Sequence, residues 1–217
     1  MAAVAMARYE ESSVTQDNNA TRAEEAVVNG EKINSECSSL SGTIDGHDYV
    51  DMGLSVKWAT CNVGADSPED YGNYYAWGET ITKSSYTKDN SKTYGMNLND
   101  IGGDSSYDAA AVNWGSKWRL PSREEFKELR DNCDWVWTIR NGVKGYEVKS
   151  KRNGNTIFLP AAGFYGKTPR RQGSYGYYWS SVPFDTDGAY ILYLSSDDCS
   201  VYWLDRYDGQ SVRPVAE

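Results

Sequence analysis

Between Gly173 and Gly209 the chain contains no Lys, Glu, Gln or Met, although all four occur elsewhere in it. These residue types share one property: none of them has a codon that ends in C. A segment rewritten through codons of the form NNC would lose all four and Trp as well, so Trp179 and Trp203 would belong to a fixed framework. Tyr, Asp and Ser are frequent in the same window. The absence of these four residue types predicts a diversified binding surface on a constant scaffold. The alternative is an ordinary loop region rich in Tyr, Ser and Asp.

Histidine and cysteine are also scarce. The single histidine, His47, is expected to be structural or solvated. The four cysteines, Cys37, Cys61, Cys133 and Cys199, form no CxxC pair and have no metal-ligand spacing. Zinc binding and Cys/His catalysis therefore have few residues to use, and we expect no metal, no cofactor and no enzymatic activity.

No run of 18 apolar residues is present, so no membrane insertion is expected. The first residues lack the basic and apolar regions of a convincing signal peptide. The net charge of −9 divides into −5 over residues 1–45, −5 over 173–209 and +1 over the remainder. Without a basic face, nucleic acid is excluded as a partner, and the acidic loops suit a protein or a cell-surface glycan.

Aromatic residues are abundant, with 17 Tyr and 8 Trp among 217 residues. A core of large aromatic side chains between Gly turns favours a loop-rich α+β domain over residues 46–217. Residues 1–45 are polar and lack hydrophobic periodicity, which predicts a flexible arm or linker that tethers the domain. Residues 62–113 read as loops with short helical turns at most.

One helix is well marked, over about residues 123–132. Ser122 can cap its first turn and Glu125 can complete a capping box. Phe126, Leu129 and Cys133 then form one apolar stripe. Antiparallel strands are expected after the helix, with hairpin turns at residues 141–142 and 153–154, both of sequence Asn-Gly.

Six motifs follow one another along the chain: VKWATCNVGA, YYAWGET, WRLPSREEF, IFLPAAG, GYYWSS and a terminal GQSVRPV. In this order they resemble the C-type-lectin-fold domains of bacterial surface and phage proteins. Two groups are similar, the Fibrobacter succinogenes major paralogous domain and the variable proteins of diversity-generating retroelements. The resemblance covers about residues 47–215 and implies a C-type lectin fold. Resemblance to the variable proteins also implies mutagenesis at template adenines, typically in AAC codons, which yields NNC codons.

The chain also resembles formylglycine-generating enzymes, which need reactive cysteines near the C-terminus. Cys199 has no partner thiol nearby in the sequence, which argues against that activity. Sugar-binding C-type lectins bind calcium through an E-P-N or Q-P-D triplet and a W-N-D triplet, and neither is present in this chain. The nearest approach, Trp203-Leu204-Asp205, lacks the amide side chain. We interpret Cys199 as a diversified position in preference to a disulfide partner, and leave a Cys61–Cys133 bridge open.

Strand alternation separates the scaffold from the binding face. The predicted core residues are Tyr190, Leu192, Leu194, Val201 and Trp203, and residues 177–179 are assigned to the framework. The outward face and the adjoining loops are predicted to form a variable region at about residues 182–208. Core packing is the alternative for the two tyrosines of that face. The predicted ligand-binding residues are Phe184, Asp185, Asp187, Ile191, Tyr193, Ser195, Asp197, Asp198, Tyr202, Leu204, Asp205, Tyr207 and Asp208.

These observations predict a receptor or adhesion protein at an extracellular, virion or bacterial cell surface. An undiversified surface module of the same fold is the main alternative, and an enzyme of the formylglycine-generating type is the third.

Overall fold

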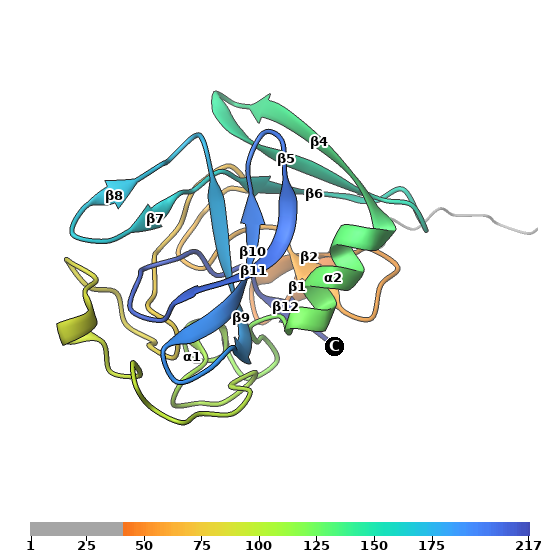
Figure 1. The fold of residues 1–217 in the computed structure, drawn as a ribbon. Coiled ribbons are helices and arrows are strands. Elements are labelled where there is room, and N and C mark those ends of the chain that lie inside the picture. The colour runs from red at the N-terminus through yellow and green to blue at the C-terminus, as the bar shows by residue number, and fades with distance from the viewer. Residues whose placement is uncertain (1–40) are drawn as a thin grey trace, which may run out of the picture. The chain divides into compact units, whose positions relative to one another are not determined.

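The structure is a computed structural model that describes residues 41–217. Most of its regular structure is short antiparallel strands in small sheets, joined by long loops (Figure 1). The first sheet has the order β1-β2-β3-β12, with β1 (Ser41–Ile44), β2 (His47–Asp51), β3 (Lys57–Ala59) and β12 (Val215–Ala216). The second contains β4 (Cys133–Arg140), β5 (Val143–Ser150) and β6 (Thr156–Pro160). The third has the order β11-β10-β9, with β9 (Gly176–Pro183), β10 (Gly188–Leu194) and β11 (Cys199–Asp205).

The remaining elements are small. A two-stranded ribbon pairs β7 (Phe164–Tyr165) with β8 (Pro169–Arg170). The helical elements within residues 41–217 are α1 (Ala109–Trp114), α2 (Arg123–Asn132) and one 3-10 turn, η1 (Lys88–Asn90). The prediction of a loop-rich α+β domain with antiparallel strands is therefore confirmed.

The predicted helix is α2, and it begins and ends as expected. The Glu125 N–H donates to Ser122 Oγ at 3.2 Å, and the Ser122 N–H donates to the Glu125 carboxylate at 2.7 Å, which completes the capping box. Phe126, Leu129 and Cys133 are buried in one apolar cluster. The apolar stripe read from the sequence therefore does face the core.

The two Asn-Gly turns differ. Asn141 and Gly142 join β4 to β5 directly, with φ of 48° and 83°, as a two-residue hairpin requires. The second connection runs from Ser150 to Thr156 and is longer than a two-residue turn. The Ser150 hydroxyl donates to the Met52 carbonyl at 2.6 Å. This tertiary contact accompanies the longer loop.

The folded part begins earlier than predicted. β1 lies within residues assigned to the polar arm, and it pairs with β2 through the turn Asp45-Gly46, with φ of 48° and 85°. The Asp-Gly pair was a hairpin signal in its own right. The domain boundary at residue 46 is therefore corrected to include residues 41–45, and the rest of the predicted arm, residues 1–40, lies outside the described residues.

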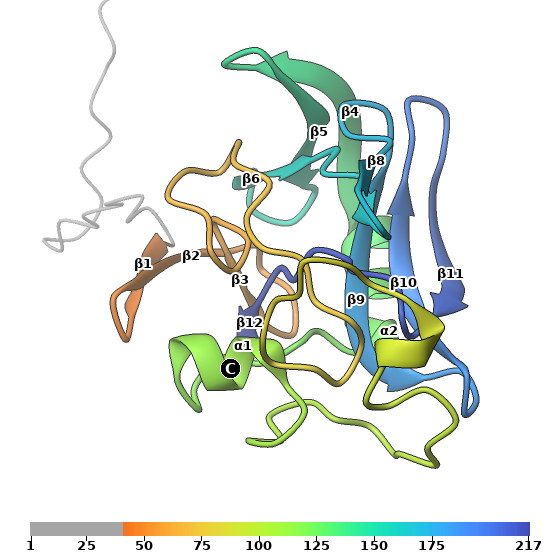
Figure 2. The same ribbon diagram turned by 90° about the vertical axis from the view of Figure 1, so that its left-hand side faces the viewer.

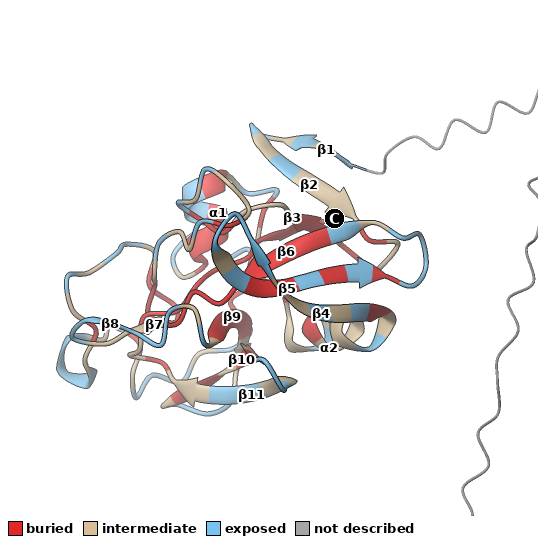
Figure 3. Ribbon diagram, turned by 90° about the horizontal axis from the view of Figure 1, so that it is seen from above, coloured by how far each residue is buried: buried red, intermediate tan, exposed pale blue. Residues whose placement is uncertain are grey.

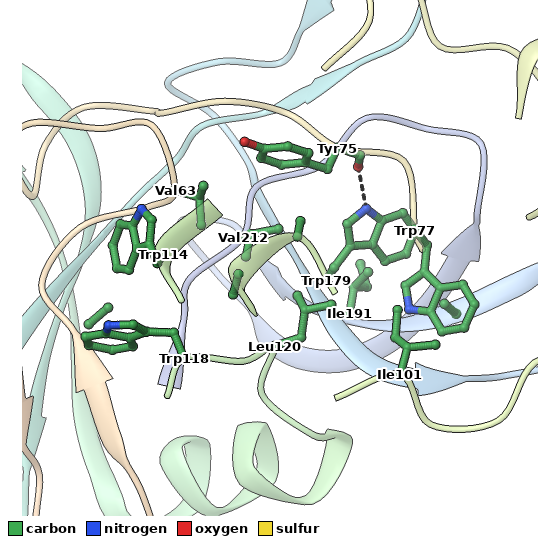
Figure 4. Close-up of a cluster of buried hydrophobic side chains, with 14 of the residues drawn as sticks. Val63, Tyr75, Trp77, Ile101, Trp114, Trp118, Leu120, Trp179, Ile191 and Val212 are labelled. Carbon is green, nitrogen blue, oxygen red and sulfur yellow. Dashed lines mark hydrogen bonds between the residues drawn. The ribbon is translucent and has the colours of Figure 1, made fainter. Parts of the chain in front are cut away.

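Two apolar clusters fill the interior. The first is rich in tryptophan and lies under the third sheet and the long loops (Figure 4). Indole N–H groups in it bond to backbone carbonyls: Trp179 Nε1 donates to the Tyr75 oxygen at 2.7 Å, and Trp77 Nε1 to the Ser180 oxygen at 2.9 Å. The second cluster takes residues from α2, β5 and β6 and from the buried faces of β9 and β10. Large amphipathic rings thus fill the core and also hold the loops around it.

The C-terminal segment Gly209–Ala216 is entirely buried. Most of β6 and β9 is buried as well, whereas β11 is largely half-buried or exposed (Figure 3). The backbone of the C-terminal segment bonds to several parts of the domain: Gln210 pairs with Tyr75, Ser211 with Tyr178, and Val215 with Trp58 and Arg119. A terminal segment of this kind joins sheets that are too small to be stable alone.

Arg213 lies at the centre of this segment and is fully buried. Its guanidinium donates to Asn62 Oδ1 at 2.9 Å and to the carbonyls of Ala59, Thr60 and Phe158 at 3.0, 2.6 and 3.0 Å. The planar fork of donors joins the first and second sheets through these carbonyls.

We predict that Arg213→Lys lowers the free energy of unfolding by about 3 kcal/mol, because an ammonium cannot replace the fork and leaves buried carbonyls without donors. Urea unfolding followed by tryptophan fluorescence measures the change. Arg152→Lys, at an exposed position, is the matched control and should change stability by about 0.5 kcal/mol or less. Equal effects of the two substitutions would contradict the assignment.

Candidate binding surface

The predicted outward residues of the third sheet do share one face. In the β10–β11 pair Ile191 lies opposite Tyr202, and Tyr193 lies opposite Ser200. Residues directly opposite in an antiparallel pair project to the same side of the sheet. The same face continues onto β9, where Tyr177 lies opposite Tyr193.

A groove of about 340 Å³ lies on this face. We call it the central groove; it is lined by Tyr177, Ile191, Tyr193, Asp198, Ser200, Tyr202 and Leu204. All of these residues fall inside the window without Lys, Glu, Gln or Met, and every one can be encoded by a codon ending in C. Four predicted residues from two strands and a fifth from the turn between them are thus brought together.

Ile191 is not a surface residue, and its assignment to the exposed face is corrected. It is 0% exposed and packs in the first cluster close to Trp179 (Figure 4). Its neighbours Leu192 and Leu194 are buried in the second cluster. β10 is the central strand between two cores, so alternation places side chains on two buried faces and does not expose either. Ile191 forms the floor of the groove.

The other residues of the face are more accessible. Tyr202 is 57% exposed, while Tyr193 and Leu204 are half-buried against the first cluster. The Tyr193 ring packs on those of Tyr177 and Tyr175, with centroids 5.5 and 5.9 Å apart. The core packing considered for Tyr193 therefore applies to one side of its ring, and the rest of the ring lines the groove.

Trp203 is not a core residue, contrary to the prediction from alternation. It is 37% exposed and stacks on Phe184, with ring centroids 4.6 Å apart and planes 3° apart. Tyr190, also predicted to be core, is half-buried beneath Phe184, with the Arg123 guanidinium 4.3 Å from its ring centroid. β11 is the edge strand of the third sheet (Figure 2), so alternation along it does not ensure that either face is covered. The remaining predicted core residue of β11, Val201, is half-buried in the second cluster.

A second groove, of about 460 Å³, adjoins the first at Tyr193. We call it the hairpin groove; it is lined by Trp137, Lys144, Gly173, Ser174, Tyr175, Tyr193, Ser195, Ser196 and Asp197. Two further predicted residues, Ser195 and Asp197, thus lie in it. Sequence reasoning missed Trp137 and Lys144, because they come from a hairpin far away in the chain.

The acidic residues of the loop after β9 have structural partners. Asp185 Oδ1 accepts hydrogen bonds from the N–H groups of Asp187 and Gly188 at 2.8 and 2.6 Å, which closes the turn. Asp187 accepts a bond from the Tyr94 hydroxyl at 2.8 Å. These carboxylates shape the loop and lie away from the two grooves.

Asp205 and Tyr207 form a similar pair, because the Tyr207 hydroxyl donates to the Asp205 carboxylate at 2.8 Å. The Tyr207 ring packs on Tyr94, with centroids 5.6 Å apart. The bond and burial raise the pKa of Tyr207 to about 12. These residues connect the variable region to the long loop at residues 80–100.

Arg206 has a structural role in the interior, although it lies in the predicted variable region and a codon ending in C can encode it. It is fully buried, and its guanidinium lies 4.2 Å from the Trp77 ring centroid. It donates to the carbonyls of Gly188, Thr93, Met96 and Asp185. Neither composition nor alternation could show this role, because every partner is a backbone oxygen, two of them from the distant loop that contains Thr93 and Met96.

Tyr207 and Asp208 line a third cavity, of about 670 Å³, beside η1 and the β7–β8 ribbon. Burial, and next the charge of Asp205, raises the pKa of Asp208 to about 6. The predicted residues are therefore divided among two adjoining grooves, one separate cavity, and the exposed Phe184 with its neighbouring turn.

Cys199 is a half-buried thiol at the start of β11, packed against the second cluster. Burial raises its pKa to about 12. Cys61, Cys133 and Cys199 are all free thiols, so the Cys61–Cys133 bridge left open by the sequence is not formed. His47 stacks on Trp114 with centroids 3.8 Å apart, as a structural residue would.

Among residues 41–217, no three His, Cys, Asp or Glu side chains are grouped so that they could hold a metal ion. In the same part of the chain, none of the helices is both long and apolar enough to cross a membrane. Comparisons with protein families, with characterised proteins and with solved structures found no match.

We predict that Ile191→Ala lowers the free energy of unfolding by about 3 kcal/mol, because it leaves a cavity in a packed core. Tyr202→Ala, on the same face and directly opposite in the ladder, should cost about 0.5 kcal/mol or less because its ring is largely in water. Chemical denaturation of both variants measures the difference. A small effect at Ile191 would show that the floor of the groove tolerates change.

We predict that Asp208 makes the stability of the protein depend on pH. Its pKa of about 6 in the folded protein lies above the value near 4 of an unfolded Asp. The folded state therefore favours the protonated acid, and this contribution to stability is complete below pH about 4 and is lost as pH rises through about 6. Asp208→Asn should thus gain stability relative to the unsubstituted protein between pH about 4 and 7. Urea midpoints measured across this range test it, and a difference independent of pH would contradict it.

Proposed function

We propose that the chain is a non-enzymatic ligand-binding protein, a receptor or adhesin, whose C-terminal surface is diversified by a retroelement. One observation carries the proposal: the lining of the central groove comes entirely from the compositional window. A surface that contacts a ligand is the part of a scaffold where variation changes specificity without changing the fold. The chemistry of the groove also suits recognition, because Tyr provides contact area at low entropic cost and Ser and Asp provide adaptable hydrogen bonds.

A C-type lectin fold is part of the same proposal. The motifs that carry the resemblance coincide with structural elements: WRLPSREEF leads into α2, IFLPAAG spans β6, and GYYWSS forms most of β9. The terminal GQSVRPV is the buried C-terminal segment. The residues of IFLPAAG, GYYWSS and GQSVRPV are buried. Six of the seven residues that line the central groove lie between GYYWSS and GQSVRPV, and Tyr177 of GYYWSS is the seventh. A buried interior with varied positions between its motifs is what the proposal requires.

The ligand would be a protein or a cell-surface glycan, bound by shape, aromatic contacts and hydrogen bonds and without a cofactor. The protein would act at an extracellular, virion or bacterial cell surface, where residues preceding the domain would tether it. The main alternative is an undiversified surface module of the same fold. For the enzymatic alternative, a nucleophilic thiol needs a lowered pKa, and the raised pKa of Cys199 does not favour it.

The gene tests the diversification directly. We expect codons ending in C at Tyr193, Ser200, Tyr202 and Leu204, and a nearby, nearly identical repeat that differs from the gene at adenines in those codons. The buried residues Leu192, Leu194 and Arg206 provide the control, because their codons should be identical in the two repeats. Sequencing the locus measures both. Codons with other third bases at the groove positions, without such a repeat, would leave the undiversified module as the better reading.

A further inference from the structure

The two grooves meet at Tyr193, but their walls have different origins. The central groove is lined entirely by the compositional window. The far wall of the hairpin groove comes from Trp137 and Lys144, on β4 and β5, outside the window. The β4–β5 hairpin and the tip of the β10–β11 hairpin lie at the same end of the molecule (Figures 1 and 2). The binding surface therefore has one wall that the proposed diversification would change and one that it would leave constant.

The constant wall is preorganised and, apart from Lys144, apolar. Trp137 is half-buried, and its ring packs edge-on against Tyr146 with centroids 5.1 Å apart. Ile139 lies two residues further along the same strand, so it projects to the same face, and it is 63% exposed. Lys144 lies directly opposite Ile139 in the ladder. An indole and an exposed isoleucine thus continue the wall beyond the hairpin groove.

Charge distinguishes the two walls. The window contains six Asp residues, and its single cation, Arg206, is fully buried. Asp197 is exposed in the hairpin groove and Asp198 is exposed in the central groove, so that carboxylates lie on both sides of Tyr193. A basic group placed over the Tyr193 ring would meet both negative charge and an aromatic face.

We propose that the adjoining grooves hold an extended segment of a partner protein, with an apolar side chain against Trp137 and Ile139 and a basic side chain beside Tyr193. This inference rests on the proposed function and adds the constant wall and the chemistry of the partner. The exposed Ile139 and the half-buried Leu204 side chains form no hydrogen bonds, so a hydroxyl-rich sugar placed against them would lose hydration without compensation. An apolar side chain gains free energy on the same surface, as at the centres of protein interfaces.

The experiment uses the full chain and a yeast-displayed library of random linear peptides of about 12 residues, a length that exceeds an extended strand in a groove. We expect enrichment of peptides in which Lys or Arg lies near an aliphatic or aromatic residue. Trp137→Ala should then weaken the binding of an enriched peptide at least about tenfold. Val136→Ala is the matched control, because Val136 is exposed on the opposite face of the same strand, and it should leave the affinity unchanged.

A charge reversal provides a variant that does not depend on the core. Lys144→Glu should tighten the binding of a basic peptide several-fold, because it removes a like charge from the groove wall and adds an opposite one. Lys149→Glu, exposed on the other face of β5, should not, and the difference should shrink at high salt. Circular dichroism and the denaturation midpoint confirm that each variant is folded.

The variants Tyr202→Ala and Trp137→Ala distinguish binding at the constant wall from binding at the central groove alone. Loss of binding in Tyr202→Ala but not in Trp137→Ala would overturn the constant wall and leave the groove as a binding site. Enrichment of peptides without basic residues, or of none, would overturn the assigned partner chemistry; a glycan array probed with the same protein would then distinguish a sugar ligand. Binding that neither substitution weakens would count against both proposals.

Discussion

The buried C-terminal segment Gly209–Ala216 is the interaction on which the rest of this structure depends. The three larger sheets are small, and much of the chain is loop, so no single layer could bury enough apolar surface to be stable by itself. The segment supplies backbone partners to Tyr75, Tyr178 and Arg119, which come from three separate parts of the chain. The Arg213 guanidinium adds bonds to carbonyls of the first and second sheets. These bonds give hydrogen-bond partners to buried polar groups that a loop-rich interior would otherwise leave unpaired.

The same arrangement explains how the surface above it could vary. The floor of the central groove is core, because Ile191 packs in the first cluster, while its strand neighbour Leu192 projects to the opposite face and is buried in the second cluster. Arg206 joins the start of β10, the loop before it and the loop that contains Thr93 and Met96 through four carbonyls. Side chains that project above this frame, such as Tyr202, contribute little to its stability, so their replacement would leave the backbone in place.

Local signals predicted the elements well. The capping box of α2, its apolar stripe and the Asn141-Gly142 turn depend on residues within a few positions of one another, and all three are found. Alternation failed at Ile191 and Trp203 because it identifies two faces of a strand but not what covers each face. β10 has a core on both sides, whereas β11 lies at the edge of the sheet. The β1–β2 hairpin was missed although Asp45-Gly46 signalled a turn, because the polar composition around it dominated the interpretation.

The sequence by itself determined the loop-rich α+β class, the helix, the Asn141-Gly142 hairpin turn, and the compositional window over residues 173–209. These follow from periodicity, capping and codon chemistry, which are properties of neighbouring residues. Only the tertiary structure decided which window residues meet at a groove, that Arg206 and Ile191 belong to the interior, and that Trp137 and Lys144 complete the surface. Those facts depend on packing between segments far apart in the chain, and burial and proximity of that kind leave no local pattern.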